Sequence, residues 1–548
     1  MTIGGGARLG RSAHVDTFCR DNLPPRDSWP ELIFELPEVR YPERLNCAYE
    51  LLDAVIARYG GDRRCLLTPP GDVWSYADLL GTVNQVARVL TGELGVVPGN
   101  RVLLRGPNNP WLAACWLAVI KAGAVAVSTM PLLRASELTT VAEIAQVNLA
   151  LCDWRFGDDL RAADLGGAPI VMYGGTGPGD LAQRAAAAPA GFAAVDTAAD
   201  DVALLAFTSG TTGRPKATMH FHRDVLAIAD TFGRHVVRPE AGDLFTGTPP
   251  LAFTFGLGGL LVFPLRAGAA TLLIEKASPE DLADEIAKHQ VTVCSTAPTA
   301  YRAMIASGKA GQLGSLRRPI SAGEHLPEAT WRAFHEATGV SLIDGIGSTE
   351  MLHVFVSAAD DGIRPGATGR AVPGYRAAIL DEAGAPVPPG MPGRLAVQGP
   401  TGCRYLNDPR QASYVQGGWN ITGDTFVQDA DGYFYYQARS DDMIVSAGSN
   451  IAGPEVEEAL LAHPAVAECA VVGLPDEARG HLVSAFVVLA AGYTGGAELT
   501  GQLQAFCKEK IAPYKYPRAI EYVAALPRTA TGKVQRHVLR SRPAARPR

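Results

Sequence analysis

The sequence has few lysines, no closely spaced cysteine pair and no long uninterrupted apolar run. Its nine cysteines are scattered and include no C-x-x-C pair, which argues against a zinc site or a disulfide framework and favours a reducing cytoplasm. The net charge of −7 gives no electrostatic reason to expect nucleic acid as a partner. These absences leave an enzyme or binding protein that handles small molecules in the cytoplasm.

Membrane insertion is also disfavoured. The most apolar stretch, residues 111–127, is interrupted by Lys121 and Gly123, and falls short of the roughly 18 apolar residues that a spanning helix needs. It predicts a buried helix that leads into a strand. The first fourteen residues contain no apolar core of the length found in signal peptides. We therefore expect neither a membrane partner nor export.

The length of 548 residues predicts at least two folding units, because single cores stop growing at about 250–300 residues. Helical patterns at 76–90, 110–122 and 279–289 alternate with short strand-like runs at 101–104, 124–128 and 291–294. This alternation is typical of an α/β fold with largely parallel sheets.

The pattern changes near residue 440. A helix is predicted from residue 454, followed by strands at 465–472 and 482–490 and a helix at 499–511. We expect a large N-terminal domain of mixed, largely parallel sheets (1–438), a hinge (439–442) and a small, mobile α+β C-terminal domain (443–548).

Residues 208–216, T-S-G-T-T-G-R-P-K, follow an apolar run at 202–207 that predicts a buried strand. Two glycines let backbone N–H groups approach an anion, four hydroxyls can donate to phosphate oxygens, and a lysine adds positive charge. The segment is not a Walker A loop, because G-x4-G-K is absent. The residues predicted to bind phosphate are Thr208, Ser209, Gly210, Thr211, Thr212, Gly213 and Lys216.

This segment resembles the phosphate loop of the adenylate-forming superfamily, which includes acyl-CoA synthetases, peptide-synthetase adenylation domains and luciferases. Further motifs of that family follow in order: S-A-G-E at 321–324, D-G-I-G-S-T-E at 344–350, T-G-D at 422–424, R-S-D at 439–441 and P-R-T-A-T-G-K at 527–533. The resemblance spans about residues 45–535. It implies that ATP activates a carboxylic acid as an acyl-adenylate, without a tightly bound organic cofactor, and that the acyl group then passes to coenzyme A.

The resemblance also assigns roles within the site. Lys533, Thr349 and Arg439 would act on the phosphates or the ribose, and Glu350 would bind Mg²⁺, which prefers carboxylate oxygen beside phosphates. Asp424 would accept hydrogen bonds from the ribose diol. The remaining nucleotide contacts implied are Gly323, Glu324, Asp344, Gly345 and Ile346.

Two positions depart from the family pattern. Ile346 and Gly347 stand where an aromatic residue usually stacks on adenine, and Ala438 replaces the usual glycine before Arg439. The hinge would pivot at Asp441. After rotation, Gly448 and Ser449 would approach the pantetheine arm of coenzyme A.

Residues 251–258, L-A-F-T-F-G-L-G, resemble the segment that lines the acyl pocket of benzoate-type CoA ligases. That match implies a small aromatic acid, 2-aminobenzoate or benzoate, because Phe255 offers a flat face and no charged group is present. Thr254 either accepts from a substrate amine or faces away. His353 is either at the pocket rim or structural. The implied pocket residues are Thr254, Phe255, Ala322, Gly347, His353 and Val354.

Two alternatives stay open at this stage. The acyl group could pass to a carrier protein acting in trans, since only the thiol would differ, or the chain could be a non-catalytic binding protein on the same fold. Retention of Lys533, Glu350 and Asp424 disfavours the second. The pathway and the oligomeric state, including a homodimer, are not determined.

Overall fold

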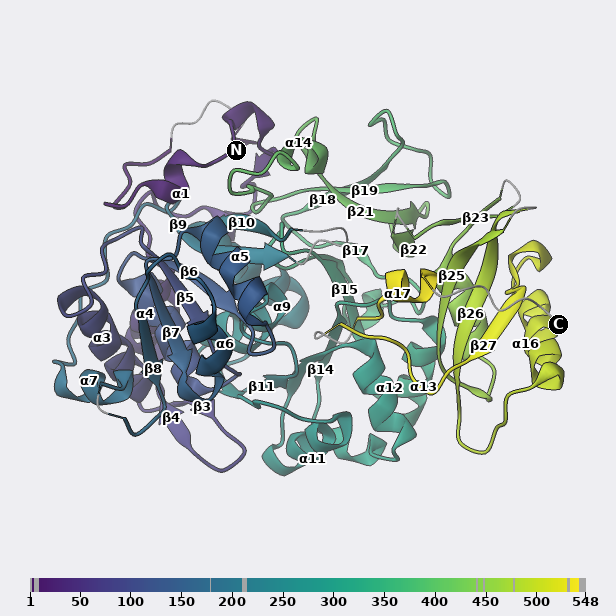
Figure 1. Ribbon diagram of the computed structural model, residues 1–548, viewed down its shortest axis with the longest axis horizontal. Helices are drawn as coiled ribbons and strands as arrows, with labels where there is room; N and C mark the ends of the chain where they lie inside the picture. The colour runs from purple at the N-terminus through teal and green to yellow at the C-terminus, as the bar shows by residue number, and fades with distance from the viewer. Residues whose placement is uncertain are drawn as a thin grey trace.

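The computed structural model of the chain describes residues 9–177, 179–208, 214–439, 442–446, 449–476, 479–529 and 533–541, and the backbone alone at 2–3 and 449–450. Two α/β layers make up most of the molecule, an antiparallel sheet lies above them, and a smaller C-terminal unit lies at one side (Figure 1). The chain begins with four short elements before the large sheets: β1 (Thr2–Ile3), α1 (Phe18–Asp21), β2 (Leu32–Ile33) and α2 (Ala54–Tyr59).

The first sheet has six strands in the order β10-β9-β6-β5-β7-β8. All neighbours are parallel except β10, which pairs antiparallel with β9. Its strands are β5 (Arg101–Arg105), β6 (Val125–Thr129), β7 (Leu149–Asp153), β8 (Ile170–Tyr173), β9 (Val202–Thr208) and β10 (Lys216–Phe221). Its helices are α3 (Tyr76–Gly92), α4 (Pro110–Lys121), α5 (Ala135–Ala145), α6 (Gly157–Ala162) and α7 (Leu181–Ala187).

The second sheet has nine strands in the order β17-β16-β15-β14-β13-β11-β12-β3-β4, parallel in its centre and antiparallel at both edges. Its strands are β3 (Arg64–Leu67), β4 (Val73–Ser75), β11 (Leu244–Gly247), β12 (Ala270–Leu272), β13 (Val293–Thr296), β14 (Arg318–Ala322), β15 (Ile343–Gly347), β16 (Val354–Ser357) and β17 (Arg370–Ala371). The helices are α8 (His222–Ile228), α9 (Thr254–Leu257), α10 (Phe263–Ala267), α11 (Pro279–His289), α12 (Pro298–Ala306) and α13 (Glu328–Thr338).

The third sheet is wholly antiparallel and ends at the predicted hinge. It contains β18 (Arg376–Leu380), β19 (Pro392–Gln398), β20 (Val415–Gln416), β21 (Trp419–Gln428) and β22 (Phe434–Arg439), with α14 (Gln411–Tyr414).

The C-terminal unit has its own sheet and its own apolar core. Two long strands, β25 and β26, form its centre, and α15 and α16 pack together beside them. Its elements are β23 (Ile444–Ser446), β24 (Ser449–Ile451), α15 (Gly453–Leu461), β25 (Val466–Asp476), β26 (Gly480–Leu489), α16 (Ala497–Lys510), β27 (Ala519–Tyr522) and α17 (Arg536–Arg540).

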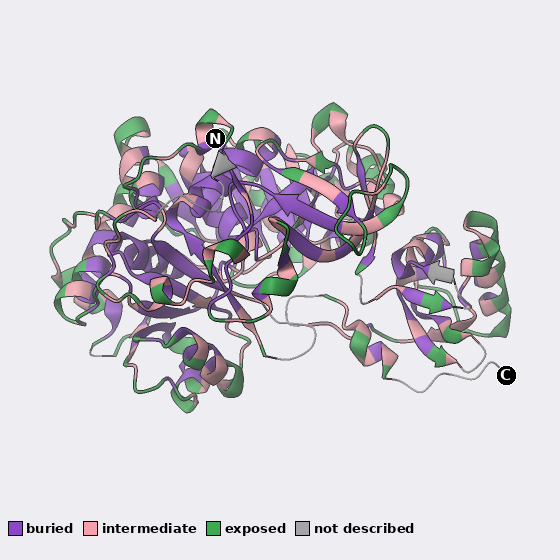
Figure 2. Ribbon diagram, turned by 90° about the horizontal axis from the view of Figure 1, so that it is seen from above, coloured by how far each residue is buried: buried purple, intermediate pink, exposed green. Residues whose placement is uncertain are grey.

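The predicted α/β fold is confirmed, and each predicted helix and strand named above is present. Buried residues concentrate on the strands and on the inner faces of the helices (Figure 2). Residues 111–127 form the buried helix and strand that their composition predicted. No helix in the described part of the chain is long and apolar enough to cross a membrane. The domain boundaries and the hinge stay predictions.

Candidate active site

The segment predicted to bind phosphate joins two antiparallel strands. β9 ends at Thr208 and β10 begins at Lys216, and these two residues are register partners, so the segment between them closes a hairpin. Ser209, Gly210, Thr211, Thr212 and Gly213 lie outside the described residues. The hydroxyl oxygen of Thr208 is buried and has no hydrogen-bond partner among the residues described, and an approaching phosphate would supply one.

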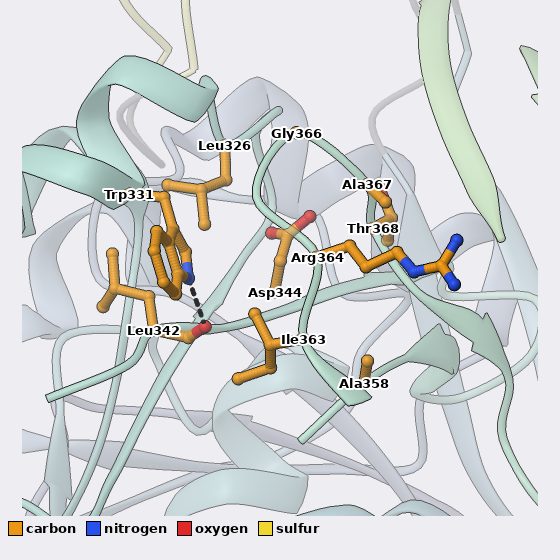
Figure 3. A pocket seen from close by; sticks show the side chains of 10 residues that line it. All are labelled: Leu326, Trp331, Leu342, Asp344, Ala358, Ile363, Arg364, Gly366, Ala367 and Thr368. Carbon is orange, nitrogen blue, oxygen red and sulfur yellow. Dashed lines mark hydrogen bonds between the residues drawn. The ribbon is translucent and has the colours of Figure 1, made fainter. Parts of the chain in front are cut away.

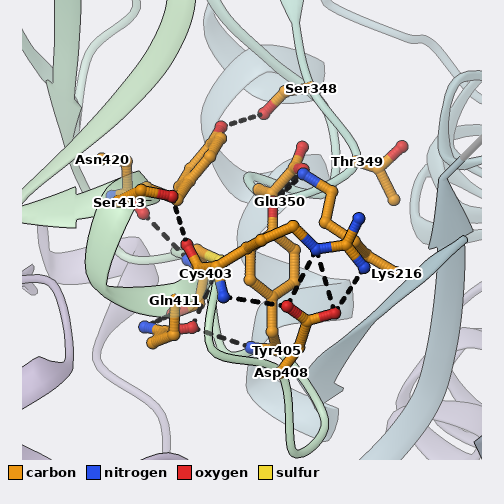
Figure 4. A network of polar contacts seen from close by, with 12 residues as sticks. Lys216, Ser348, Thr349, Glu350, Cys403, Tyr405, Asp408, Gln411, Ser413 and Asn420 are labelled. Carbon is orange, nitrogen blue, oxygen red and sulfur yellow. Dashed lines mark hydrogen bonds and ion pairs between the residues drawn. The ribbon is translucent and has the colours of Figure 1, made fainter. Parts of the chain in front are cut away.

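Lys216 lies at the centre of a polar network that joins three distant segments (Figure 4). Its ammonium nitrogen donates to the Tyr405 hydroxyl at 2.7 Å and lies 3.5 Å from Oε1 of Glu350. The Tyr405 hydroxyl in turn donates to that same oxygen at 2.5 Å. The predicted phosphate lysine and the predicted magnesium ligand are therefore direct neighbours.

Thr349 and Glu350 lie in the turn after β15, and contacts with neighbouring elements hold this turn in place. The carbonyl oxygen of Thr349 accepts from Nε2 of the fully buried His220, at 2.8 Å. The hydroxyl of Ser348 contacts that of Tyr414 at 3.2 Å. These contacts position Glu350 from the backbone as well as from its carboxylate.

Asp424 and Arg439 face each other because they are register partners on β21 and β22. Arg439 donates to the carboxylate at 3.0 Å. Burial raises the pKa of Asp424, and the Arg439 guanidinium opposes that rise. A vicinal diol could hydrogen-bond to this carboxylate, because a carboxylate can accept more than one hydrogen bond.

Lys533 comes to the same site from the far end of the chain. Its side chain is exposed, yet the protein around it and the Arg439 guanidinium lower its pKa, while the charges of Asp424, Glu324 and Glu350 act in the opposite direction. An amine held among one guanidinium and three carboxylates is suited to bind and release a phosphate or carboxylate oxygen.

An ion pair and a hydrogen bond join the C-terminal unit to the large domain. Arg528 lies 3.5 Å from Glu324 and 2.6 Å from Glu468 of β25. Arg302 of α12 donates to the carbonyl oxygen of Val466 at 3.0 Å. The C-terminal unit is thus docked with its lysine beside the nucleotide segments.

Asp344 on β15 directs its carboxyl into a small pocket beside α13 (Figure 3). The Oδ1 atom is buried and unpartnered among the described residues. Burial raises the pKa of Asp344 to about 8, although Thr368 and the N–H of Gly345 oppose the rise. The pocket is lined by Leu326, Trp331, Leu342, Asp344, Ala358, Ile363, Arg364, Gly366, Ala367 and Thr368.

This carboxyl gives a prediction for stability as a function of pH. Because its pKa in the folded protein lies above the ordinary value of 3.8, the folded state binds the extra proton, and that contribution is lost as pH rises toward and through about 8. Asp344→Asn removes the titration. We expect its melting temperature, relative to the unaltered chain, to rise by several degrees between pH 5 and pH 8.5, because about 1.4 kcal/mol per pH unit, over the roughly three units up to the folded pKa, amounts to about 4 kcal/mol. Differential scanning calorimetry at both pH values measures this; a pH-independent difference would contradict it.

Three phenylalanines lie around His353, and one of them, Phe255, is a residue assigned to the acyl pocket. The ring of His353 lies 5.7 Å from Phe255, 5.3 Å from Phe232 and 4.7 Å from Phe263. Both ring nitrogens are buried and unpartnered among the described residues, and burial lowers the pKa of His353 to about 3. His353 is therefore a neutral, enclosed side chain behind Phe255, and of the two earlier readings the geometry favours the structural one.

Backbone contacts place the other pocket residues. Gly347 pairs with Val354, and a Cβ atom at Gly347 would lie 2.5 Å from the carbonyl oxygen of His353. Only glycine fits there, because the backbone of His353 already fills the position that a Cβ atom would take. Ala322 ends β14 beside β15, and Thr254 begins α9 together with Phe255.

The sequence places Asp441 at the hinge, and Gly448 and Ser449 near coenzyme A. Asp441 and Gly448 are not among the described residues, and of Ser449 only the backbone is described. Gly323 lies at the end of β14 with φ of +90°, which glycine adopts readily, and Ile346 is half-buried on β15. Sequence reasoning missed Tyr405 and Arg528; the R-Y-L-N run at 404–407 was the only signal for the first.

Two family models match the chain: AMP-binding enzyme over residues 52–404 and AMP-binding enzyme C-terminal domain over 455–533. Together with the two-domain fold and the site, they show that the chain belongs to the AMP-binding, adenylate-forming family. Within it, the chain is an AMP-forming acyl-CoA ligase.

Individual relatives are similar over nearly the whole chain. A benzoate–CoA ligase of Thauera aromatica is 38% identical over 92% of this chain and 97% of its own length. An anthranilate CoA ligase, solved in complex with anthranoyl-AMP, superposes with a TM-score of 0.87 at 34% identity, covering 92% of this chain and 98% of that one. A benzoate CoA ligase from Burkholderia xenovorans LB400 gives 0.83 at 30% identity, covering 91% and 100%.

Proposed function

We propose that the chain is an aryl-CoA ligase that converts a small aromatic acid and ATP to an aroyl-adenylate and pyrophosphate, then transfers the aroyl group to the thiol of coenzyme A with release of AMP. The observation that carries this proposal is the contact of Lys216 with Glu350, together with a Lys533 on which the charges of Glu350 and Asp424 act.

The chain's own residues perform the first step by positioning and by charge, without a protein nucleophile. Lys216 and Lys533 offset the repulsion between the substrate carboxylate and the phosphates. Asp424 holds the ribose, which aligns the α-phosphorus with the carboxylate oxygen. That oxygen attacks phosphorus, the bond to the β-phosphate oxygen breaks, and pyrophosphate leaves with both bonding electrons.

Glu350 fits a magnesium ion that is bound mainly by substrate phosphates. It is an oxygen ligand at the lysine side of the site, and Mg²⁺ in such sites takes only one or two carboxylates. Mg²⁺ would supply further charge neutralisation on the phosphates. No group of three or more possible metal ligands occurs among the described residues.

The second step requires the C-terminal unit to turn. We place the hinge at residues 439–442 with Asp441 as its pivot, and the coenzyme A contacts at Gly448 and Ser449. The break between the third sheet, which ends at Arg439, and the C-terminal sheet, which begins at Ile444, supports this placement.

The aromatic acid is 2-aminobenzoate or benzoate. Phe255 provides a flat face, and the proposed wall residues Ala322 and Val354 are apolar, so a second charged group on the acid is disfavoured. Two similar proteins are named for these acids. Thr254 is the hydroxyl nearest in sequence to Phe255 and would accept from an ortho amine.

A substrate panel tests this. We expect kcat/KM for 2-aminobenzoate and benzoate to exceed that for octanoate and for phthalate at least about tenfold, since loss of ring stacking and burial of an unpaired charge each cost more than about 1.4 kcal/mol. Pyrophosphate release with each acid measures it. Preference for octanoate would contradict the aryl assignment. Running the best acid with coenzyme A and with a holo carrier protein identifies the thiol.

A further inference from the structure

Tyr405 joins the two groups on which the first half-reaction depends. Tyr405 lies outside the named helices and strands, where its backbone forms an isolated antiparallel β-bridge with Thr218 of β10. Its side chain is fully buried. The sequence separates it by 189 residues from Lys216 and by 55 from Glu350, yet it contacts both (Figure 4).

The hydrogen bonds of this hydroxyl have a fixed direction. A phenol has one hydrogen to donate, and Glu350 as a carboxylate can only accept, so Tyr405 donates to Glu350 and accepts from the ammonium of Lys216. The chain of donors therefore runs from Lys216 through Tyr405 to Glu350.

Both contacts converge on one carboxylate oxygen. Tyr405 and Lys216 each approach Oε1 of Glu350, at 2.5 Å and 3.5 Å, and neither engages Oε2. The ring of Tyr405 also lies under the lysine ammonium, 4.6 Å from the centroid, where a cation is attracted to the aromatic face. Tyr405 thus contacts the lysine through both its hydroxyl and its ring, and its hydroxyl engages one oxygen of the Glu350 carboxylate.

We propose that Tyr405 is a positioning residue for adenylate formation: its hydroxyl fixes Oε1 of Glu350 so that Oε2 faces the cation of the incoming nucleotide, and it keeps Lys216 beside the phosphate segment. The inference rests on the proposed function for the roles of Glu350 and Lys216. It assigns to Tyr405 no contact with substrate.

Tyr405→Phe removes the hydroxyl and keeps the ring. Mg²⁺ should strengthen the binding of a non-hydrolysable ATP analogue, and we expect the ratio of the dissociation constants without and with Mg²⁺ to fall about tenfold in this variant. That fall corresponds to the loss of a charge-assisted hydrogen bond of about 1.4 kcal/mol. The dissociation constant for the analogue without Mg²⁺ should change less than about threefold. Isothermal titration calorimetry with and without Mg²⁺ measures both values on the full chain.

Tyr76→Phe is the matched control. Tyr76 is equally buried, and its hydroxyl donates to the carbonyl oxygen of Ala269 at 2.7 Å, within the core of the large domain. Tyr76→Phe removes a similar hydrogen bond outside the site. The enhancement by Mg²⁺ of analogue binding to this variant should therefore match that of the unaltered chain. A tenfold fall in this control as well would show a general loss of structure and overturn the assignment.

A double-mutant cycle tests whether Tyr405 acts through Glu350. In a Glu350→Gln background, Tyr405→Phe should cause no further fall in the Mg²⁺ enhancement, because the oriented carboxylate is already gone. Independent, additive losses would overturn the inference. Absence of any adenylate formation or Mg²⁺ enhancement in the unaltered chain would instead contradict the proposed function, so the two failures are distinguishable.

Discussion

Lys533→Ala is expected to slow adenylate formation by about 10²–10³-fold, the cost of losing one preorganised charged donor to a developing negative charge. The charges of Asp424, Glu324, Glu350 and Arg439 all act on the ammonium group of Lys533, and we propose that the substrate carboxylate and the α-phosphate meet near it. Transfer of the aroyl group from supplied aroyl-adenylate to coenzyme A should be nearly unaffected, because that step would take place after the C-terminal unit has turned. Single-turnover measurements of each half-reaction separate the two.

Lys515→Ala is the control for that experiment. Lys515 lies in the same C-terminal unit, where its ammonium group bonds the Glu455 carboxylate at 2.6 Å, away from the site. We expect both half-reactions to keep rates within about twofold, because a partly exposed ion pair contributes little. An equal loss in both half-reactions of Lys533→Ala would contradict the assigned role of Lys533.

Arg404→Met is expected to destabilise the large domain by about 3–5 kcal/mol, the usual cost of leaving one partner of a buried ion pair unpaired. Arg404 and Asp224 are both fully inaccessible and hydrogen-bonded to each other. Burial acts to raise the pKa of Asp224, but the Arg404 guanidinium, together with the neighbouring His220 and Arg223, holds that pKa below its ordinary value. A fall in the melting temperature on the order of 10 °C should appear by scanning calorimetry.

The double variant Asp224→Asn with Arg404→Met should recover much of that loss. Asparagine removes the uncompensated charge, and its side-chain oxygen can still accept from the N–H of Phe221, which Asp224 does at 3.0 Å. Arg161→Met removes an exposed arginine whose pair with Asp158 spans only one helical turn, and it should shift the melting temperature little. A double variant no more stable than Arg404→Met would show that packing, rather than charge, makes the pair necessary.

Local signals predicted elements well where capping was complete. The helix expected at 279–289 has those bounds, because Ser278 accepts from the N–H of Asp281 and Pro279 fits the first turn. The strand expected at 291–294 lies at Val293–Thr296 instead. Gln290 adopts a left-handed conformation, and the N–H of Val291 still donates to the carbonyl oxygen of Ile286. The first residues of the apolar run therefore belong to the end of the helix, and the strand begins two residues later than expected.

The sheet arrangement was predicted less completely. Alternating helices and strands correctly indicated parallel pairing in the centre of the two large sheets. The antiparallel third sheet was not anticipated, since its strands at 376–439 carry no periodic signal that distinguishes a meander from a crossover.

The sequence by itself determined the α/β class, the change of character near residue 440 and the order of the nucleotide segments, because each of these is written in contiguous residues. Only the tertiary structure decided that Tyr405 joins Lys216 to Glu350, that His353 is enclosed by three phenylalanines, and that Arg528 ties the segment of Lys533 to Glu324. Such contacts join residues far apart in the chain, and they depend on how the sheets stack and how the C-terminal unit docks. Those are properties of the packed core and not of any local pattern.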